Sequence, residues 1–120
     1  MPRKPTVNTN EPEKRIAAAL AKDSTSLDLS NLGLTELPEA LGQLTQLRAL
    51  DISRNELTAL PDALGNLAKL RRLNVSNNAL FALPEVLGEL SQLKELNASY
   101  NRLIALHDTI DRLTILVDCL

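Results

Sequence analysis

Residues suited to acid, base or nucleophile chemistry are rare in this 120-residue chain, which has one histidine, His107, and one cysteine, Cys119. A catalytic histidine needs a nucleophile within reach and a partner that orients it. His107 has no serine or cysteine at a spacing known from such sites, and its neighbour Asp108 is expected in a turn. Three equivalent segments carry proline at this position. We therefore interpret His107 as a substituted proline and predict no enzyme activity.

Acidic residues recur at one position of these segments and could ligate a cation. They are Glu39, Asp62, Glu85 and Asp108. Their even spacing spreads them along one side of the molecule instead of bringing them together, and an acid in the first turn of a helix is favoured by the helix dipole alone. The nearby Gly42, Gly65 and Gly88 stand singly, so they form no phosphate loop. We expect no metal and no cofactor.

A period of 23 residues organises the rest of the chain, because Leu27, Leu50, Leu73 and Leu96 recur at that spacing. Seven apolar positions repeat in each of four periods, and of these 28 positions only Ile52, Val75, Ala98 and Ile110 are not leucine. Units this regular cannot bury their apolar faces alone and must stack around one shared core. The sequence therefore predicts an α/β solenoid.

Each unit divides into a short strand and a return segment. Alternation such as Leu50-Asp51-Ile52 predicts parallel strands on the concave side, and Pro38 to Leu44, with proline at the first helical position, predicts a short helix or 3₁₀ turn on the convex side. We expect a disordered lead-in over residues 1–9 and an N-terminal capping helix within 10–23, spanning Glu11 to Lys22. Its predicted inward face is Ile16, Ala17, Leu20 and Ala21.

The repeat domain is expected to occupy residues 24–120, and three alternatives stay open for its C-terminal end. In the first, residues 108–120 form a helical cap. In the second, the chain is a fragment, and the next repeat, which would open at Cys119, is missing. In the third, two open ends meet in a homodimer.

Asparagine recurs where three of the strands turn away, at Asn55, Asn78 and Asn101, while Leu32 takes this position in the first repeat. An amide side chain can satisfy backbone groups that a bend leaves without partners. We predict a buried asparagine ladder that begins at the second repeat.

Alternation predicts which strand residues point outward from the concave face: Ser26, Asp28, Ser30, Ala49, Asp51, Ser53, Arg72, Asn74, Ser76, Glu95, Asn97 and Ser99. A basic rim with one aromatic flanks them. The candidate protein-binding residues are Arg48, Asp51, Arg54, Arg71, Arg72, Asn74, Asn77, Lys94, Glu95, Asn97, Tyr100 and Arg102. Such a face suits an acidic peptide or protein patch. The alternative is that these residues only keep an exposed strand soluble.

The net charge of −2 is too small and too mixed in sign to favour nucleic acid. No apolar run is long enough for a membrane helix, and the single cysteine and polar N-terminus indicate an intracellular protein.

The motif Leu-Pro-x-x-Leu-Gly-x-Leu at residues 37–44, 60–67 and 83–90 resembles intracellular leucine-rich repeat proteins of bacteria and plants, over residues 27–118. The stretch from Ile16 to Leu37 is similar to the opening of repeat domains in bacterial Roco-type GTPases and secreted effectors. The resemblance implies a horseshoe-shaped arc whose concave strand face binds other proteins. His107 and Asp111 depart from the motif and put the regularity of the last turn in doubt.

These observations favour a non-catalytic protein-interaction module. The second hypothesis is a sensing arm of a larger signalling enzyme, such as a Roco-type GTPase, kinase or ubiquitin-ligase effector. The third is a structural scaffold or designed consensus protein, which irregularities such as Phe81, Ala98 and His107 disfavour.

Overall fold

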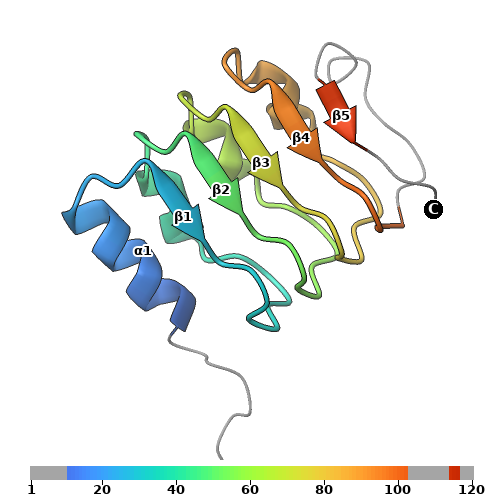
Figure 1. Cartoon of the computed structure of the whole chain (residues 1–120), viewed down its shortest axis with the longest axis horizontal. Helices are drawn as coiled ribbons and strands as arrows, with labels where there is room; N and C mark the ends of the chain where they lie inside the picture. The colour runs from blue at the N-terminus through green and yellow to red at the C-terminus, as the bar shows by residue number, and fades with distance from the viewer. Residues whose placement is uncertain (1–10, 103–113, 117–120) are drawn as a thin grey trace, which may run out of the picture.

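The computed structural model describes residues 11–102 and the backbone of residues 114–116. One helix precedes a run of strands that alternate with 3₁₀ turns, and the strands form one parallel sheet in the order β1-β2-β3-β4-β5 (Figure 1). The elements are α1 Glu11–Ala21, β1 Ser26–Asp28, η1 Glu39–Gln43, β2 Ala49–Asp51, η2 Asp62–Asn66, β3 Arg72–Asn74, η3 Glu85–Glu89, β4 Glu95–Asn97 and β5 Thr114–Leu116. The predicted α/β solenoid is confirmed.

The first four strands pair at the 23-residue offset of the sequence, so Leu27, Leu50, Leu73 and Leu96 face one another across the sheet. The fifth strand breaks this offset. Leu96 pairs with Ile115, which is 19 residues later (115 − 96), so the expectation that the next strand opens at Cys119 is wrong by four residues.

A continuous helix over residues 108–120 is also wrong, because β5 runs through the middle of that segment. Without β5 the backbone groups on the outer edge of β4 would lack ladder partners, and a segment with the β-branched Thr114 and Ile115 suits a strand that pairs with them. His107 and Asp111, which depart from the motif just before this strand, lie outside the described residues.

The core is a stack of aliphatic side chains between the sheet and the 3₁₀ turns. Every apolar repeat position from Leu37 to Ala98 is buried, and many of these residues, such as Leu64 and Leu80, are fully enclosed. Leu27, Leu32 and Leu34, in the first repeat, stay partly exposed while packing against this core. The units therefore share one continuous hydrophobic core instead of enclosing separate ones.

The N-terminal helix α1 covers the open end of this core at β1. Its buried residues are Pro12, Ile16 and Ala19, whereas Ala17, Leu20 and Ala21 are exposed, so the predicted inward face is wrong except at Ile16. A helix presents residues four and three apart on one side, and the face 12-16-19 is the one turned to the repeats. Arg15 fastens the helix, because its Nη1 donates to the Asp28 carbonyl at 2.7 Å and its Nε donates to Glu11 at 2.7 Å.

The return segments are 3₁₀ helices, one of the two predicted forms. Pro38, Pro61 and Pro84 are the N-cap residues with extended backbone, not the first helical residues as predicted. Gly42 lets neighbouring turns approach closely. A Cβ atom there would lie 3.1 Å from the Cβ atom of Ala63 and 3.2 Å from its carbonyl oxygen.

Candidate functional site

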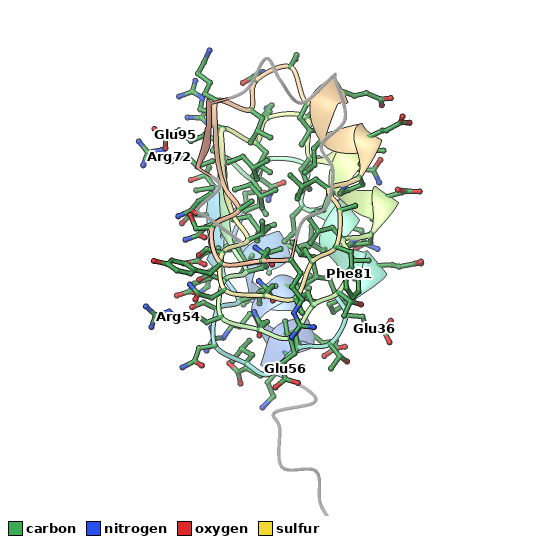
Figure 2. All side chains as sticks on the ribbon, turned by 90° about the vertical axis from the view of Figure 1, so that its right-hand side faces the viewer. Glu36, Arg54, Glu56, Arg72, Phe81 and Glu95 are labelled. Carbon is green, nitrogen blue, oxygen red and sulfur yellow. The ribbon has the colours of Figure 1, made fainter. Side chains whose placement is uncertain are left out.

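The strand side of the solenoid carries most of the candidate residues. Arg54, Arg72 and Glu95 project from this side, whereas Phe81 and Glu36 lie on the side of the 3₁₀ turns (Figure 2). Exposed candidates are Arg48, Arg54, Arg71, Arg72, Asn77, Lys94, Glu95, Tyr100 and Arg102, and partly exposed ones are Asp51, Asn74 and Asn97. We call residues 25–31, 48–54, 71–77 and 94–100 the strand face.

The serines of the strand face are less available than alternation predicts. Ser53 and Ser76 are buried, with 6% of each exposed, so their assignment to the outward surface is wrong. The cause is a local hydrogen-bonded turn. The backbone N–H and hydroxyl of Ser53 donate to Oδ1 of Asp51 at 2.9 and 2.6 Å, and Ser76 makes the same two bonds to Asn74 at 3.0 and 2.7 Å.

The first repeat has the same turn, with Ser30 donating to Asp28 from its backbone N–H at 2.8 Å and from its hydroxyl at 2.6 Å. These bonds, led by the hydroxyl, together with the charge of Arg15, lower the pKa of the Asp28 carboxyl against the opposing effect of its desolvation. One carboxylate oxygen of this exposed residue is therefore already committed to the fold.

Ser99 donates its backbone N–H to Asn97 in a fourth turn, and each of the four turns is followed by a residue with left-handed backbone conformation. The φ angles are 57° at Asn31, 59° at Arg54, 58° at Asn77 and 58° at Tyr100. Asparagine tolerates this conformation, while arginine and tyrosine adopt it less often. The repeat pattern did not predict this shared geometry or the candidate Asn31, although asparagine occurs at this repeat position in both Asn31 and Asn77.

The residue after each left-handed position, from the second repeat on, forms the asparagine ladder. The Asn55 amide Nδ2 donates to the carbonyls of Leu29, Ile52 and Ser53 at 3.0–3.1 Å, and its Oδ1 accepts from the N–H groups of Leu32 and Leu34 at 3.0 Å. Asn78 and Asn101 repeat the donated bonds one and two units later, and each accepts from one N–H group, that of Leu57 and Leu80 respectively. These amides bind the chain's own backbone, so they belong to the scaffold.

Two candidate residues pair with each other. Arg72 and Glu95 are register partners on β3 and β4, and their charged atoms lie 3.2 Å apart. Both side chains are well exposed, at 73% and 61%, so this ion pair adds little to stability. It does mask part of the charge that Arg72 would offer to a partner.

A polar hollow of about 350 Å³ opens where β1, β2 and β3 turn away from the sheet. Its lining consists of Ser30, Asn31, Asp51, Ser53, Arg54, Asn74, Ser76 and Asn77. Amide, hydroxyl, carboxylate and guanidinium groups meet there without any apolar wall. Such a lining suits hydrogen bonding to a polar segment more than enclosure of an apolar ligand.

A metal site and a membrane-spanning helix find little support in the part of the chain that the structure describes. Within that part no three His, Cys, Asp or Glu side chains come together as metal ligands. Its helices include none of the length and apolarity that a bilayer crossing requires. His107 and Cys119 lie outside it.

The parallel sheet, the stacked 3₁₀ turns and the asparagine ladder define a solenoid repeat protein. The chain belongs to the leucine-rich repeat family, since a family model described as a leucine-rich repeat region matches residues 26–116. Leucine-rich repeat domains are generally protein-interaction modules and are typically non-catalytic. The search of curated proteins gave no significant match.

Solved structures of bacterial effectors have a similar fold. The leucine-rich repeat domain of a Shigella effector is 27% identical with a TM-score of 0.70, and 95% of this chain matches 57% of it. YopM from Yersinia enterocolitica is 29% identical with a TM-score of 0.68, covering 98% of this chain and 29% of YopM. The repeat domain of the type III effector XopL is 25% identical with a TM-score of 0.70, covering 97% and 44%. The chain thus spans less than two thirds of each.

Proposed function

We propose that this protein is a non-catalytic interaction module that binds a protein or peptide on its strand face. The observation that carries the proposal is that inward-facing and outward-facing polar side chains of each repeat have different roles. The asparagine ladder satisfies the bend from inside, while outward-pointing side chains of four strands in register, such as Arg72 and Glu95, stay exposed. Repeat stacks of this kind present such faces as extended binding surfaces.

An exchange of charges tests this assignment without changing net charge. The variant Arg72→Glu/Glu95→Arg keeps the ion pair between β3 and β4 but reverses its direction, and we expect it to fold with unchanged stability. Partners captured by affinity purification and identified by mass spectrometry should be lost or weakened, because the charge pattern of the face is altered.

The matched control exchanges two charges on the return side, as Glu36→Arg/Lys69→Glu, at residues that are both exposed. It should retain the captured partners. Identical partner sets for the wild type and both variants would contradict the assignment of binding to the strand face.

A second candidate is a repeat arm within a larger signalling protein. The observation that favours it is that the matching segment makes up 57%, 29% and 44% of the three similar chains described above. A genomic reading frame that continues beyond the codon for Leu120 into a catalytic domain would establish this alternative. A stop codon there would exclude such a domain on that side.

We also propose that the C-terminal end mediates a homodimer, since β5 is the last strand of the sheet among the residues that the structure describes. An intracellular location stays a prediction from the sequence.

A further inference from the structure

Three exposed cations stand at the residues that precede successive strands: Arg48 before β2, Arg71 before β3 and Lys94 before β4. Their backbones are joined directly. The N–H of Arg71 donates to the carbonyl of Arg48 at 2.8 Å, and the N–H of Lys94 donates to that of Arg71 at 2.9 Å. Neighbouring strands lie about 4.8 Å apart, so these side chains leave the sheet next to one another. We call them the cation row.

The cation row has no ionic partner within residues 11–102, although the adjacent Arg72 pairs with Glu95. Two unit charges at such a spacing repel each other in water by about 1 kcal/mol, and like charges on neighbouring strands destabilise a sheet. The fold does not require a cation here, since Thr25 holds the same position in the first repeat. The cation row therefore places like charges on neighbouring strands without an ionic partner in this part of the chain.

Charges are also segregated between the two sides of the solenoid. The strand face has five cations and three acids, a net charge of +2 (5 − 3), counting Arg48, Arg54, Arg71, Arg72 and Lys94 against Asp28, Asp51 and Glu95. The return segments 34–47, 57–70 and 80–93 have one cation and five acids, a net charge of −4 (1 − 5), counting Lys69 against Glu36, Glu39, Asp62, Glu85 and Glu89. Within these segments the acids thus outnumber the cations on the return side, and the cations outnumber the acids on the strand face.

We propose that the cation row binds an acidic stretch of the partner protein, which lies across the strands instead of along them. This inference rests on the proposed function of the strand face. A polypeptide fits better than nucleic acid because Asp28, Asp51 and Glu95 lie among the cations, and a continuous phosphate backbone would meet these carboxylates as well. Separate carboxylates of a peptide can sit over the cation row alone. The polar hollow lies at the opposite ends of β1, β2 and β3 from the residues that precede the strands, so it is not part of this contact.

The test uses a fluorescent peptide in which glutamate alternates with serine, and a second peptide with glutamine in place of each glutamate. We expect fluorescence anisotropy to show salt-sensitive binding of the acidic peptide only. The variant Arg48→Gln/Arg71→Gln/Lys94→Gln should weaken this binding at least about tenfold, because it removes all three contacts. Its stability in urea should be equal to or higher than that of the wild type.

A matched control, Lys14→Gln/Lys22→Gln/Lys69→Gln, removes the same total charge from exposed positions outside the cation row. It should bind the acidic peptide within about twofold of the wild type, since distant exposed charges are screened. Equal weakening by both triple variants would overturn the proposal, because the attraction would then reflect net charge alone. Equal binding of the glutamine peptide would overturn it as well.

Two further outcomes identify other occupants and also overturn the proposal. One is tighter binding of a single-stranded oligonucleotide of equal charge. The other is salt-sensitive self-association that the cation-row variant abolishes, which would assign the row to the acidic return side of a second copy. If the acidic peptide fails to bind while the Arg72→Glu/Glu95→Arg exchange still alters partner capture, only this inference fails. If the exchange has no effect either, the proposed function fails with it.

Discussion

Asn77 and Asn78 are adjacent, yet their side chains have different tasks. Asn77 is exposed, takes a left-handed backbone conformation and borders the polar hollow. Asn78 turns inward, where its amide donates to the carbonyls of Ile52, Val75 and Ser76 and accepts from the N–H of Leu57. Asn77 is therefore a candidate for binding and Asn78 for stability. Substitutions at the two positions should separate these two roles.

Replacing Asn55 by alanine should lower the free energy of unfolding by about 2–4 kcal/mol, because buried backbone groups lose their partners. The N–H groups of Leu32 and Leu34 and the carbonyl of Leu29 all bond to this amide. Urea denaturation followed by circular dichroism measures the effect. Asn66→Ala, at an exposed residue of η2, serves as the control, and similar losses from both substitutions would contradict the role of the asparagine ladder.

The lowered pKa of Asp28 predicts how stability depends on pH. The unfolded chain binds a proton at this carboxyl near the ordinary value of 3.8, whereas the folded chain binds it only at lower pH. The stabilisation is therefore complete above that value and is lost as the pH falls through the folded-state pKa. Asp28→Asn keeps the acceptor for Ser30, as Asn74 does for Ser76. In this variant the free energy of unfolding should therefore fall less steeply as the pH is lowered.

Urea denaturation of the wild type and Asp28→Asn across the acidic range measures this difference. Superimposable stability curves for the two proteins would show that Asp28 does not contribute to the acid response.

At the level of elements, the close approach of 3₁₀ turns depends on glycine. The space at Gly42 is limited by the Cβ and carbonyl oxygen of Ala63, and the space at Gly65 by the Cβ of Val86, 3.2 Å from where a Cβ would lie. These neighbours belong to the adjacent unit, so the contact sets how tightly successive units stack. The recurrence of glycine at this position thus reflects packing rather than ligand binding.

Gly42→Ala should destabilise the protein by about 1–3 kcal/mol through overpacking. The second variant, Gly42→Ala/Ala63→Gly, removes the Ala63 Cβ, one of the two atoms at 3.1 Å, and should recover part of the loss. Thermal and urea unfolding of the single and double variants give the coupling between the two residues. Strictly additive effects would mean that the two turns do not touch in the way described.

The elements also show which features the sequence could predict. Leucines at one fixed period predicted the sheet, its register and its core, and that register places Arg72 opposite Glu95 (72 + 23). Periodicity could not orient α1, because Ala17 and Leu20 are as apolar as Pro12 and Ala19, and only the contact with the first repeat selects a face. It also could not place β5, since the motif is lost at His107 and Asp111 before that strand begins.

The candidate site was less predictable than the fold for a physical reason. Alternation tells which strand residues point away from the core, but it does not report the hydrogen bonds that side chains make locally. Ser53 and Ser76 are drawn into the turn by Asp51 and Asn74, and this removes them from the accessible surface. The left-handed conformation of Arg54 and Tyr100 likewise follows from the turn and not from residue type.

At the level of the whole molecule, association is predicted at the C-terminal end. Sedimentation velocity should show a dimer fraction that grows with protein concentration, because β5 is the outermost strand among the described residues and outer strands can pair with a second chain. The dimer should persist in the cation-row variant, which leaves β5 untouched. A strict monomer at the highest concentration would remove this proposal.

The uniform offset between β1, β2, β3 and β4 has a consequence for size. An additional 23-residue unit placed between two of them would meet on each side the same kind of neighbour that it replaces. The inner wall would grow by about 4.8 Å for each insertion while both ends stay as they are. The number of repeats then sets the length of the partner segment that the inner wall can hold. Duplication of a repeat can change this length without altering the core.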